Sequence, residues 1–276
     1  MQNTIKAGNV EISNRKKMVL ISGPCQIESR DHAVFMAKSI AEICKKLDIG
    51  YIFKSSFDKA NRSSAKSQRG IGIDAAIDIF KEIKETIGCP ILTDVHDVEQ
   101  CKIMGEVVDI LQIPAFLCRQ TDLLKAAATT GKIVNVKKGQ FLAPWDAKNI
   151  VEKLEHFGSK NIMLTERGTS FGYNTLVSDM RGLSIMSDFG YPVIFDATHS
   201  VQQPGGLGGA SGGDRKFVKL LGRAALAATP IAGIFAEVHE NPDCAPSDGP
   251  CMLRLDTLEK TLSEFLAIDS LTKQAE

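Results

Sequence analysis

One pattern recurs eight times along this sequence. Each repeat has a short apolar run, then a polar or glycine-rich stretch, and most continue into a segment with helical periodicity. The runs are often rich in β-branched residues and bounded by Gly, Pro or polar residues, as buried strands are. They are MVLISGPC (18–25), YIFKSSF (51–57), PILTDV (90–95), VDILQIP (108–114), KIVNVKKG (132–139), NIMLTERG (161–168), PVIFDATHS (192–200) and GIFAEVHE (233–240).

The segments between the runs place apolar residues at i, i+3 and i+4, which predicts helices. The clearest are HAVFMAKSIAEICKKL, AAIDIFKEIKETI, DAKNIVEKLEHF and KFVKLLGRAALAA, and a last one, LDTLEKTLSEFLAI, follows the eighth run. The least regular stretch is 168–190, where the sixth helix is expected. Strands that alternate with helices predict a parallel α/β sheet, and eight of them favour closure into a (β/α)8 TIM barrel.

The remaining organisation is simple. IKAGNVEI (5–12) predicts a short N-terminal β-hairpin that turns on Ala7-Gly8-Asn9. A chain of 276 residues suits one barrel, and no linker or low-complexity stretch divides it. We therefore expect a single domain over 1–276.

Charge and cysteine usage exclude several classes of protein. The 33 basic residues balance the 33 acidic ones, so no overall field favours nucleic acid or an anionic membrane. Neither a signal peptide nor an apolar run of transmembrane length is apparent. The seven cysteines are scattered without a CxxC pair, which indicates a reducing compartment and predicts a cytoplasmic protein.

Polar residues stand where the predicted strands end. In a barrel of this kind the active site lies at the C-terminal ends of the strands. A buried charge without a partner costs several kcal/mol, so a polar strand end indicates either chemistry or a buried ion pair. An ion pair could explain any one position, but a full ring of them favours an active site. The ring comprises Cys25, Lys54, Asp94, Gln112, Lys137, Arg167, His199 and Glu237.

The basic members of this ring suggest anionic substrates. Lys54, Lys137 and Arg167, together with Lys59 just beyond the second strand, concentrate positive charge in a chain with none overall. Arginine binds phosphate or carboxylate through a fork of donors, whereas lysine acts as a point charge. DKANRSS (58–64) adds Arg62 and hydroxyl groups, although a solvated loop would explain this stretch equally well.

The other members resemble metal ligands. Cys25, His199 and Glu237 end strands one, seven and eight, which are consecutive in a closed ring, and Asp248 lies in the following loop. Neighbouring strands are about 4.8 Å apart, so these side chains would converge. Mixed soft and hard ligands favour zinc, iron(II) or manganese over magnesium. The alternative is a buried free cysteine beside a structural histidine.

Two nearby features have less certain roles. GGLGGASGGDR (205–215) follows the seventh strand, where barrels bind phosphate or close a lid, but it lacks the ending of a P-loop and simple flexibility is an equal alternative. His239 lies two residues after Glu237 and so faces the same way along a strand. It would line the site or support Glu237.

Together these segments closely resemble one enzyme family over nearly the whole chain. They are GPCQIES (23–29), FKSSFDKANRSS (53–64), TDVH (93–96), QIPAFLCRQTDL (112–123), NVKKGQF (135–141), ERGTSFGY (166–173), FDATHSVQ (195–202), GGASGGDR (208–215) and AEVHENPDCAPSDGP (236–250). The chain resembles the 3-deoxy-D-manno-octulosonate 8-phosphate synthases, also called 2-dehydro-3-deoxyphosphooctonate aldolases. KANRSS is the most specific piece, because the related 3-deoxy-D-arabino-heptulosonate 7-phosphate synthases have a KPRTS-like sequence there.

The resemblance implies a reaction, a pathway and an assembly. The family condenses phosphoenolpyruvate with arabinose 5-phosphate, and the product enters the inner core of lipopolysaccharide, which implies a Gram-negative-type source. A homotetramer of barrels capped by the hairpin is also implied. Cysteine at position 25 is similar to the metal-dependent class, since metal-independent members have asparagine there, whereas Pro250 looks more like the metal-free class. We therefore expect a divalent metal.

The resemblance also assigns roles to individual residues. Phosphoenolpyruvate would be bound by Lys59, Lys137 and Arg167, with Lys54, Asp94 and Gln112 beside them. Asn61, Arg62 and Ser63 would bind the sugar phosphate, and Arg119 resembles the arginine that reaches the sugar phosphate of a neighbouring subunit. The metal would be held by Cys25, His199, Glu237 and Asp248. The candidate catalytic residues are His199, Asp248 and Lys59, the first two for proton transfer.

Three other functions remain open. The seven-carbon synthase would use erythrose 4-phosphate in similar chemistry, and a sialic acid synthase is a more distant enzyme alternative. A barrel that binds sugar phosphates without catalysis is a different class of protein. A pure binding protein does not require Cys25, His199, Glu237 and Asp248 together, which argues against it.

Overall fold

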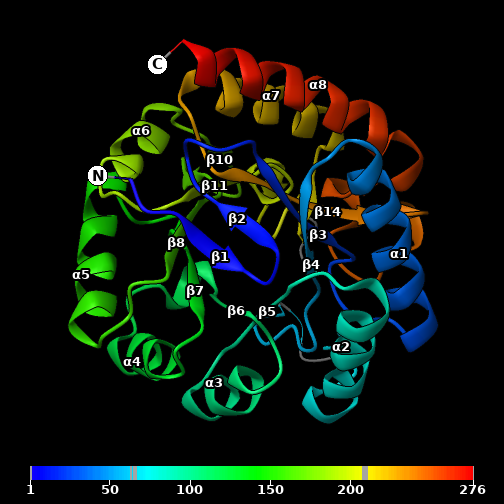
Figure 1. Ribbon diagram of the computed structural model, residues 1–276. Coiled ribbons are helices and arrows are strands. Elements are labelled where there is room, and N and C mark those ends of the chain that lie inside the picture. The colour runs from blue at the N-terminus through cyan, green and yellow to red at the C-terminus, as the bar shows by residue number, and fades with distance from the viewer. Residues whose placement is uncertain (1, 63, 65–66, 207–210, 276) are drawn as a thin grey trace.

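The computed structural model describes residues 2–62, 64, 67–206 and 211–275. Eight parallel strands form a ring in the order β11-β8-β7-β6-β5-β4-β3-β14, and pairing of β11 with β14 closes it. The predicted (β/α)8 barrel is therefore confirmed, with one strand in each predicted run (Figure 1). The strands are β3 (Val19–Gly23), β4 (Gly50–Lys54), β5 (Ile91–Asp94), β6 (Ile110–Ile113), β7 (Ile133–Lys137), β8 (Ile162–Glu166), β11 (Val193–Asp196) and β14 (Gly233–His239).

Helices surround this ring and bury their apolar faces against its outside (Figure 1). Local signals set several of their ends: Ser29 accepts a hydrogen bond from the His32 amide at the start of α1, and Gly88 ends α2 in a left-handed conformation. Among the described residues, none of the helices combines the length and apolarity needed to cross a membrane. The helices are α1 (Arg30–Lys46), α2 (Ile73–Ile87), α3 (Val98–Gly105), α4 (Thr121–Thr129), α5 (Lys148–His156), α6 (Arg181–Ser187), α7 (Val218–Ala228) and α8 (Leu255–Gln274).

The predicted N-terminal hairpin lies across one opening of the barrel (Figure 1). Its strands, β1 (Ile5–Ala7) and β2 (Val10–Ile12), pair with Ala7 opposite Val10, so the turn itself consists of Gly8 and Asn9. The inward side chains of the hairpin form one apolar cluster with the side chains that fill the barrel. Asn14 ties the hairpin to the chain just before β11, because it donates to the Tyr191 carbonyl and accepts from the Val193 amide. The N-terminal opening is thereby closed by packing.

Short secondary pairings shape the loops at the other opening. They join β9 (Thr169–Ser170) to β10 (Leu176–Val177), β12 (Gln202–Gln203) to β13 (Gly212–Gly213), and β15 (Leu253–Arg254) to the end of β14. These pairs follow β8, β11 and β14. Arg167 and His199 lie just beyond β8 and β11, and Glu237 lies within β14, two positions before its end. Structured loops therefore surround the end of the barrel where the polar residues gather.

Gly233 makes a testable contribution to this fold. It begins β14, and a Cβ there would lie 2.3 Å from the Val19 carbonyl oxygen of the neighbouring strand. Relief of this clash requires movement of backbone, so we expect Gly233→Ala to lower the free energy of unfolding by about 1–3 kcal/mol, measured by urea denaturation. Gly182→Ala is the matched control, because its Cβ would meet Pro144 at an ordinary 3.4 Å within α6. Equal effects of the two changes would contradict the steric explanation.

Candidate active site

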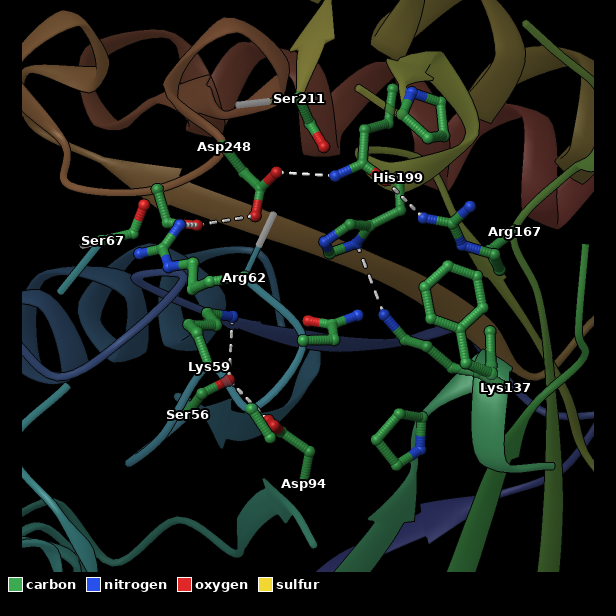
Figure 2. Close-up of a pocket in the computed structure, with 18 of the residues that line it drawn as sticks. Ser56, Lys59, Arg62, Ser67, Asp94, Lys137, Arg167, His199, Ser211 and Asp248 are labelled. Atoms are coloured by element: carbon green, nitrogen blue, oxygen red, sulfur yellow. Dashed lines mark hydrogen bonds between the residues drawn. The ribbon is translucent and has the colours of Figure 1, made fainter. Parts of the chain in front are cut away.

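A cavity of about 1050 Å³ opens at the C-terminal end of the barrel. Most of the predicted site residues line it, although they come from segments spread over almost 200 positions of the chain (Figure 2). The predicted residues on its wall are Lys54, Lys59, Asn61, Arg62, Asp94, Gln112, Lys137, Arg167, His199 and Asp248.

The other predicted residues lie elsewhere. Cys25 and Glu237 are each 1% exposed and lie beside Lys54 and Asp248, behind the cavity wall. Arg119 is exposed and does not line the cavity of its own chain. Ser63 is outside the described residues, as are residues 207–210 of the glycine-rich loop, so these predictions stay untested.

One side of the cavity carries Lys54 and Lys59. Lys54 Nζ lies 3.1 Å from Glu237 Oε1 and 3.8 Å from Asp94 Oδ1. Lys59 Nζ donates to Ser56 Oγ, and Ser56 in turn donates to Asp94 Oδ1 at 2.5 Å. Burial alone would lower the pKa of Lys59, but the carboxylates of Glu237 and Asp94 raise it. Lys59 therefore stays cationic beside the cavity.

A second buried network orients His199. Asp196 Oδ2 lies 2.7 Å from His199 Nδ1 and 2.5 Å from Lys137 Nζ. Burial alone would raise the pKa of Asp196, but the two neighbouring groups hold it well below its usual value. An ionised Asp196 accepts a hydrogen from Nδ1, so Nε2 is the ring nitrogen of His199 that faces Glu237. Burial lowers the pKa of Lys137 despite the Asp196 charge, and its Nζ lies 4.1 Å from the centre of the Phe235 ring.

Arg167 is a buried cation that the fold leaves partly unpaired. Its residue is 5% exposed, Nη2 donates to Gln202 Oε1 at 2.7 Å, and the buried Nη1 has no hydrogen-bond partner. Burial lowers the pKa of Arg167 from its usual value. The described residues supply no carboxylate within ion-pairing distance. Because an unpaired buried guanidinium is costly, this arrangement fits an anionic ligand.

The predicted metal ligands partly converge. The ligand atoms of Cys25, Glu237 and Asp248 all lie within 4.8 Å of one another. His199 is not part of that cluster, but its Nε2 is 3.7 Å from Glu237 Oε2. Glu237 Oε2 is itself buried without a hydrogen-bond partner. A carboxylate oxygen without a partner, an imidazole nitrogen and a thiol are together a donor set that transition metals prefer, so these residues fit such an ion.

The protonation of this cluster is consistent with a ligand role. Burial, followed by the Glu237 charge, raises the pKa of the Cys25 thiol well above its usual value. Cys25 Sγ donates to Asp248 Oδ2 at 3.2 Å, and Asp248 has its pKa lowered by His199 and Lys59 in spite of burial. In the metal-free protein Cys25 is therefore a neutral thiol, and binding of a metal would release its proton.

Arg62 approaches the cavity from the loop after β4. Its guanidinium donates to Ser247 Oγ, Gln26 Oε1 and the Pro246 carbonyl, which joins this loop to the one that carries Asp248. Figure 2 places Arg62 and Lys59 on one side of the cavity, and Arg167 and Lys137 on the other. The cavity therefore has cationic groups at two separated positions.

Several functional positions were not singled out from the sequence. Asp196 orients His199, Gln202 bridges Arg167 to Asp248, and Ser56 links Lys59 to Asp94. Gln202 Nε2 donates to Asp248 Oδ1 at 2.7 Å. His96 completes the wall beside Asp94, which raises the pKa of this histidine although burial alone would lower it. All four residues lie within the sequence segments that carry the family resemblance. The sequence therefore marked them only as polar residues close to a predicted site residue.

The residues whose roles were open have structural partners. His239 is 4% exposed, hydrogen-bonds Glu28 and does not line the cavity. Cys251 packs against Gly213 of β13, and exposed Cys244 accepts from the Asn241 side chain. Neither cysteine is part of the cluster of possible ligands. Pro250 lines the cavity in the short turn that follows Asp248.

Comparison with known proteins identifies the family. The model of the DAHP synthetase I family matches residues 2–274. The chain is 61% identical over 274 residues to the 2-dehydro-3-deoxyphosphooctonate aldolase of Rickettsia bellii (strain OSU 85-389), covering 99% of this chain and 100% of that protein. It is 60% identical over 274 residues to the aldolase of the same name from Rickettsia prowazekii (strain Madrid E), with 99% of each chain covered. The chain therefore belongs to the DAHP synthetase I family of enzymes, among the 2-dehydro-3-deoxyphosphooctonate aldolases.

Proposed function

We propose that this enzyme condenses phosphoenolpyruvate with D-arabinose 5-phosphate and water, giving 3-deoxy-D-manno-octulosonate 8-phosphate and inorganic phosphate. The observation that carries the proposal is one cavity with cationic groups on two sides, including the unpaired Nη1 of Arg167. The family relationship supports it, and the names of the relatives favour the eight-carbon product over the heptulosonate alternative. We assign the product to the lipopolysaccharide inner core on the same basis.

The residues suggest how the two anions are held for reaction. Arg167, Lys137 and Lys59 bind the carboxylate and phosphate of phosphoenolpyruvate, with Lys54, Asp94 and Gln112 around them. Asn61 and Arg62 bind the sugar phosphate from the other side. Positive charge on both sides offsets the repulsion between the substrates and reduces the entropic cost of bringing them together.

The bond changes follow from this placement. C3 of the enol attacks the aldehyde carbon, whose oxygen gains a proton, and C2 develops oxocarbenium character. Water adds at C2 and loses a proton, and the tetrahedral intermediate then expels phosphate by cleavage of its C–O bond. His199 and Asp248 are our candidates on the wall for these proton transfers, a role open to each of them only while it does not ligate the ion proposed below, and Asp196 and Gln202 hold them in place.

A divalent metal completes the proposal. Cys25, His199, Glu237 and Asp248 would hold zinc, iron(II) or manganese, and the unpartnered Glu237 Oε2 supports this assignment. The ion would polarise an aldehyde oxygen or a water molecule as a Lewis acid. The chain's own contribution is a buried soft sulfur ligand, a buried carboxylate and an imidazole already oriented by Asp196.

We also propose a homotetramer. Large aromatic side chains are exposed in the three consecutive loops after β6, β7 and β8. Arg119 is exposed at the end of the first of these loops, which supports a role at a neighbouring subunit's site. In these three loops the exposed aromatic residues are Phe116, Phe141, Trp145, Phe171 and Tyr173. Sedimentation equilibrium measures the assembly directly, and a monomer with full activity would contradict this part of the proposal.

A cytoplasmic location is supported by the cysteines. All seven are free thiols, and six of them are buried. Free thiols of this kind are typical of reducing compartments.

Release of phosphate tests the reaction itself. We expect phosphate to appear when phosphoenolpyruvate and arabinose 5-phosphate are present together, with erythrose 4-phosphate a much poorer second substrate. A chelator should abolish the activity, and added zinc, iron(II) or manganese should restore it. Preference for erythrose 4-phosphate would contradict the assignment to the octulosonate product. If activity survives chelation and elemental analysis finds no metal, the assigned reaction stands and the proposed metal requirement is wrong.

A further inference from the structure

A second group of potential metal ligands lies away from the active site, between the N-terminal end of α1 and the C-terminal end of β14. One ligand atom each from Glu28, His32 and His239 lies within 4.8 Å of the other two. The imidazole rings of His32 and His239 pack against each other with their centres 4.8 Å apart. Two imidazoles and a carboxylate are the ligand types that zinc and neighbouring divalent transition metals prefer.

His32 is oriented as a ligand. Its Nε2 lies 2.9 Å from Glu240 Oε2, and its Nδ1 is buried with no hydrogen-bond partner and lies 4.0 Å from Glu28 Oε1. An ionised Glu240 accepts the hydrogen of Nε2, so Nδ1 is the ring nitrogen that faces Glu28. A carboxylate that fixes the far nitrogen of an imidazole is the usual arrangement behind a metal-binding histidine.

His239 can present its nitrogen to the same point. Its Nε2 lies 2.9 Å from Glu28 Oε1, and its Nδ1 lies 2.9 Å from the Asn241 amide and 3.2 Å from Glu240 Oε2. The Asn241 amide donates to Nδ1 in the metal-free protein, so Nε2 carries the hydrogen and donates to Glu28. Binding of a metal at Nε2 would require this hydrogen to move to Nδ1, where Glu240 Oε2 would accept it in place of the bond from the Asn241 amide.

We propose that Glu28, His32 and His239 form a second site for a divalent transition metal, with Glu240 as the carboxylate that orients both histidines. The two carboxylates balance the charge of the ion. His239 is 4% exposed and His32 is half-buried, whereas Glu28 and Glu240 face solvent, so the site has a dry inner wall and an open outer side. Three protein ligands with an open position fit zinc or cobalt(II) completed by water.

The location connects this second site to the active site. Cys25 and Glu28 lie three residues apart in the loop that follows β3, and Glu237 and His239 lie two residues apart on β14. An ion between Glu28 and His239 would therefore cross-link the two segments that carry Cys25 and Glu237. We expect the second ion to stabilise these segments without contacting the substrates.

Titration of the untagged, metal-free chain with cobalt(II) tests the proposal and separates the two sites. A thiolate ligand gives cobalt a charge-transfer band in the near ultraviolet, whereas nitrogen and oxygen ligands give only visible d–d bands. We expect the wild-type chain to bind two equivalents, one with and one without the charge-transfer band. Cys25→Ala should lose the band and retain the second ion. His32→Gln should retain the band and bind one equivalent less.

Two further variants complete the test. Glu240→Gln should weaken the second site by about 10- to 100-fold, the usual effect of losing a carboxylate behind a ligating histidine. His156→Gln is the matched control, because His156 is exposed on α5, outside both clusters, and should leave two equivalents bound. A wild-type chain that binds cobalt only with the charge-transfer band would overturn the second site, as would His32→Gln and Glu240→Gln variants that bind like wild type. A wild-type chain that binds cobalt only without the charge-transfer band would contradict only the proposed active-site metal.

Discussion

Replacement of Cys25 by alanine is expected to remove the active-site metal and to lower kcat/KM by more than about 100-fold. Loss of a residue that only hydrogen-bonds a metal ligand typically lowers metal affinity or activity by about 10- to 100-fold. Cys25 is a direct ligand in the proposed site, so its loss should cost more. The change removes the one soft ligand and leaves an imidazole and two carboxylates. Those groups favour harder ions and hold zinc or iron(II) less tightly. Steady-state kinetics and elemental analysis of the same preparation measure both effects.

The control for this experiment is another cysteine of the same chain. Cys244 is exposed and outside the cluster, so Cys244→Ala should keep both the metal and the rate. Cys25 is fully buried, and its truncation leaves only a small cavity, so thermal unfolding should show that the variant is folded. A Cys25→Ala enzyme with full rate and no bound metal would contradict the proposed role of Cys25. The assignment of the reaction would stand.

Replacement of Arg167 by alanine should lower kcat/KM for phosphoenolpyruvate by a still larger factor. We expect kcat/KM for this substrate to fall by about 10³-fold, which corresponds to about 4 kcal/mol, because a charge-assisted contact in a buried site is lost. Arg167 is 5% exposed and its Nη1 lacks a partner, so its burial is compensated only when an anion binds. Steady-state kinetics with phosphoenolpyruvate varied and arabinose 5-phosphate saturating measure the loss.

Two variants show whether the loss arises from the site. Arg167→Lys keeps the charge but not the fork of donors, so its activity should lie between those of wild type and Arg167→Ala. Arg181→Ala removes an exposed arginine whose partner is Asp179, and it should leave the kinetics unchanged. The kinetics of Arg167→Ala are also measured with arabinose 5-phosphate varied. If only the KM for this sugar rises, Arg167 binds the sugar phosphate instead.

Local patterns in the sequence were sufficient to predict the architecture. Strand runs such as KIVNVKKG and helical segments such as AAIDIFKEIKETI predicted β7 and α2 to within a few residues, because apolar spacing reflects which faces are buried. The irregular stretch 168–190 contains the short pair β9–β10 and a single short helix, α6, whose position depends on packing more than on periodicity. The polar strand ends were predicted for a similar reason, since a barrel brings every such end to one rim.

What the sequence by itself determined was therefore the eight-fold repeat and the ring of polar residues, which it divided into cationic groups and candidate metal ligands. Only the tertiary structure decided which of them are partners. Lys137 with Asp196, Gln202 between Arg167 and Asp248, and the pairing of His32 with His239 join residues 35 to 207 positions apart in the sequence. Such contacts depend on closure of the barrel and on the course of its loops, and no local periodicity encodes them. The unpaired atoms of Arg167 and Glu237, on which the proposed chemistry depends, become visible only when every neighbouring group has been placed.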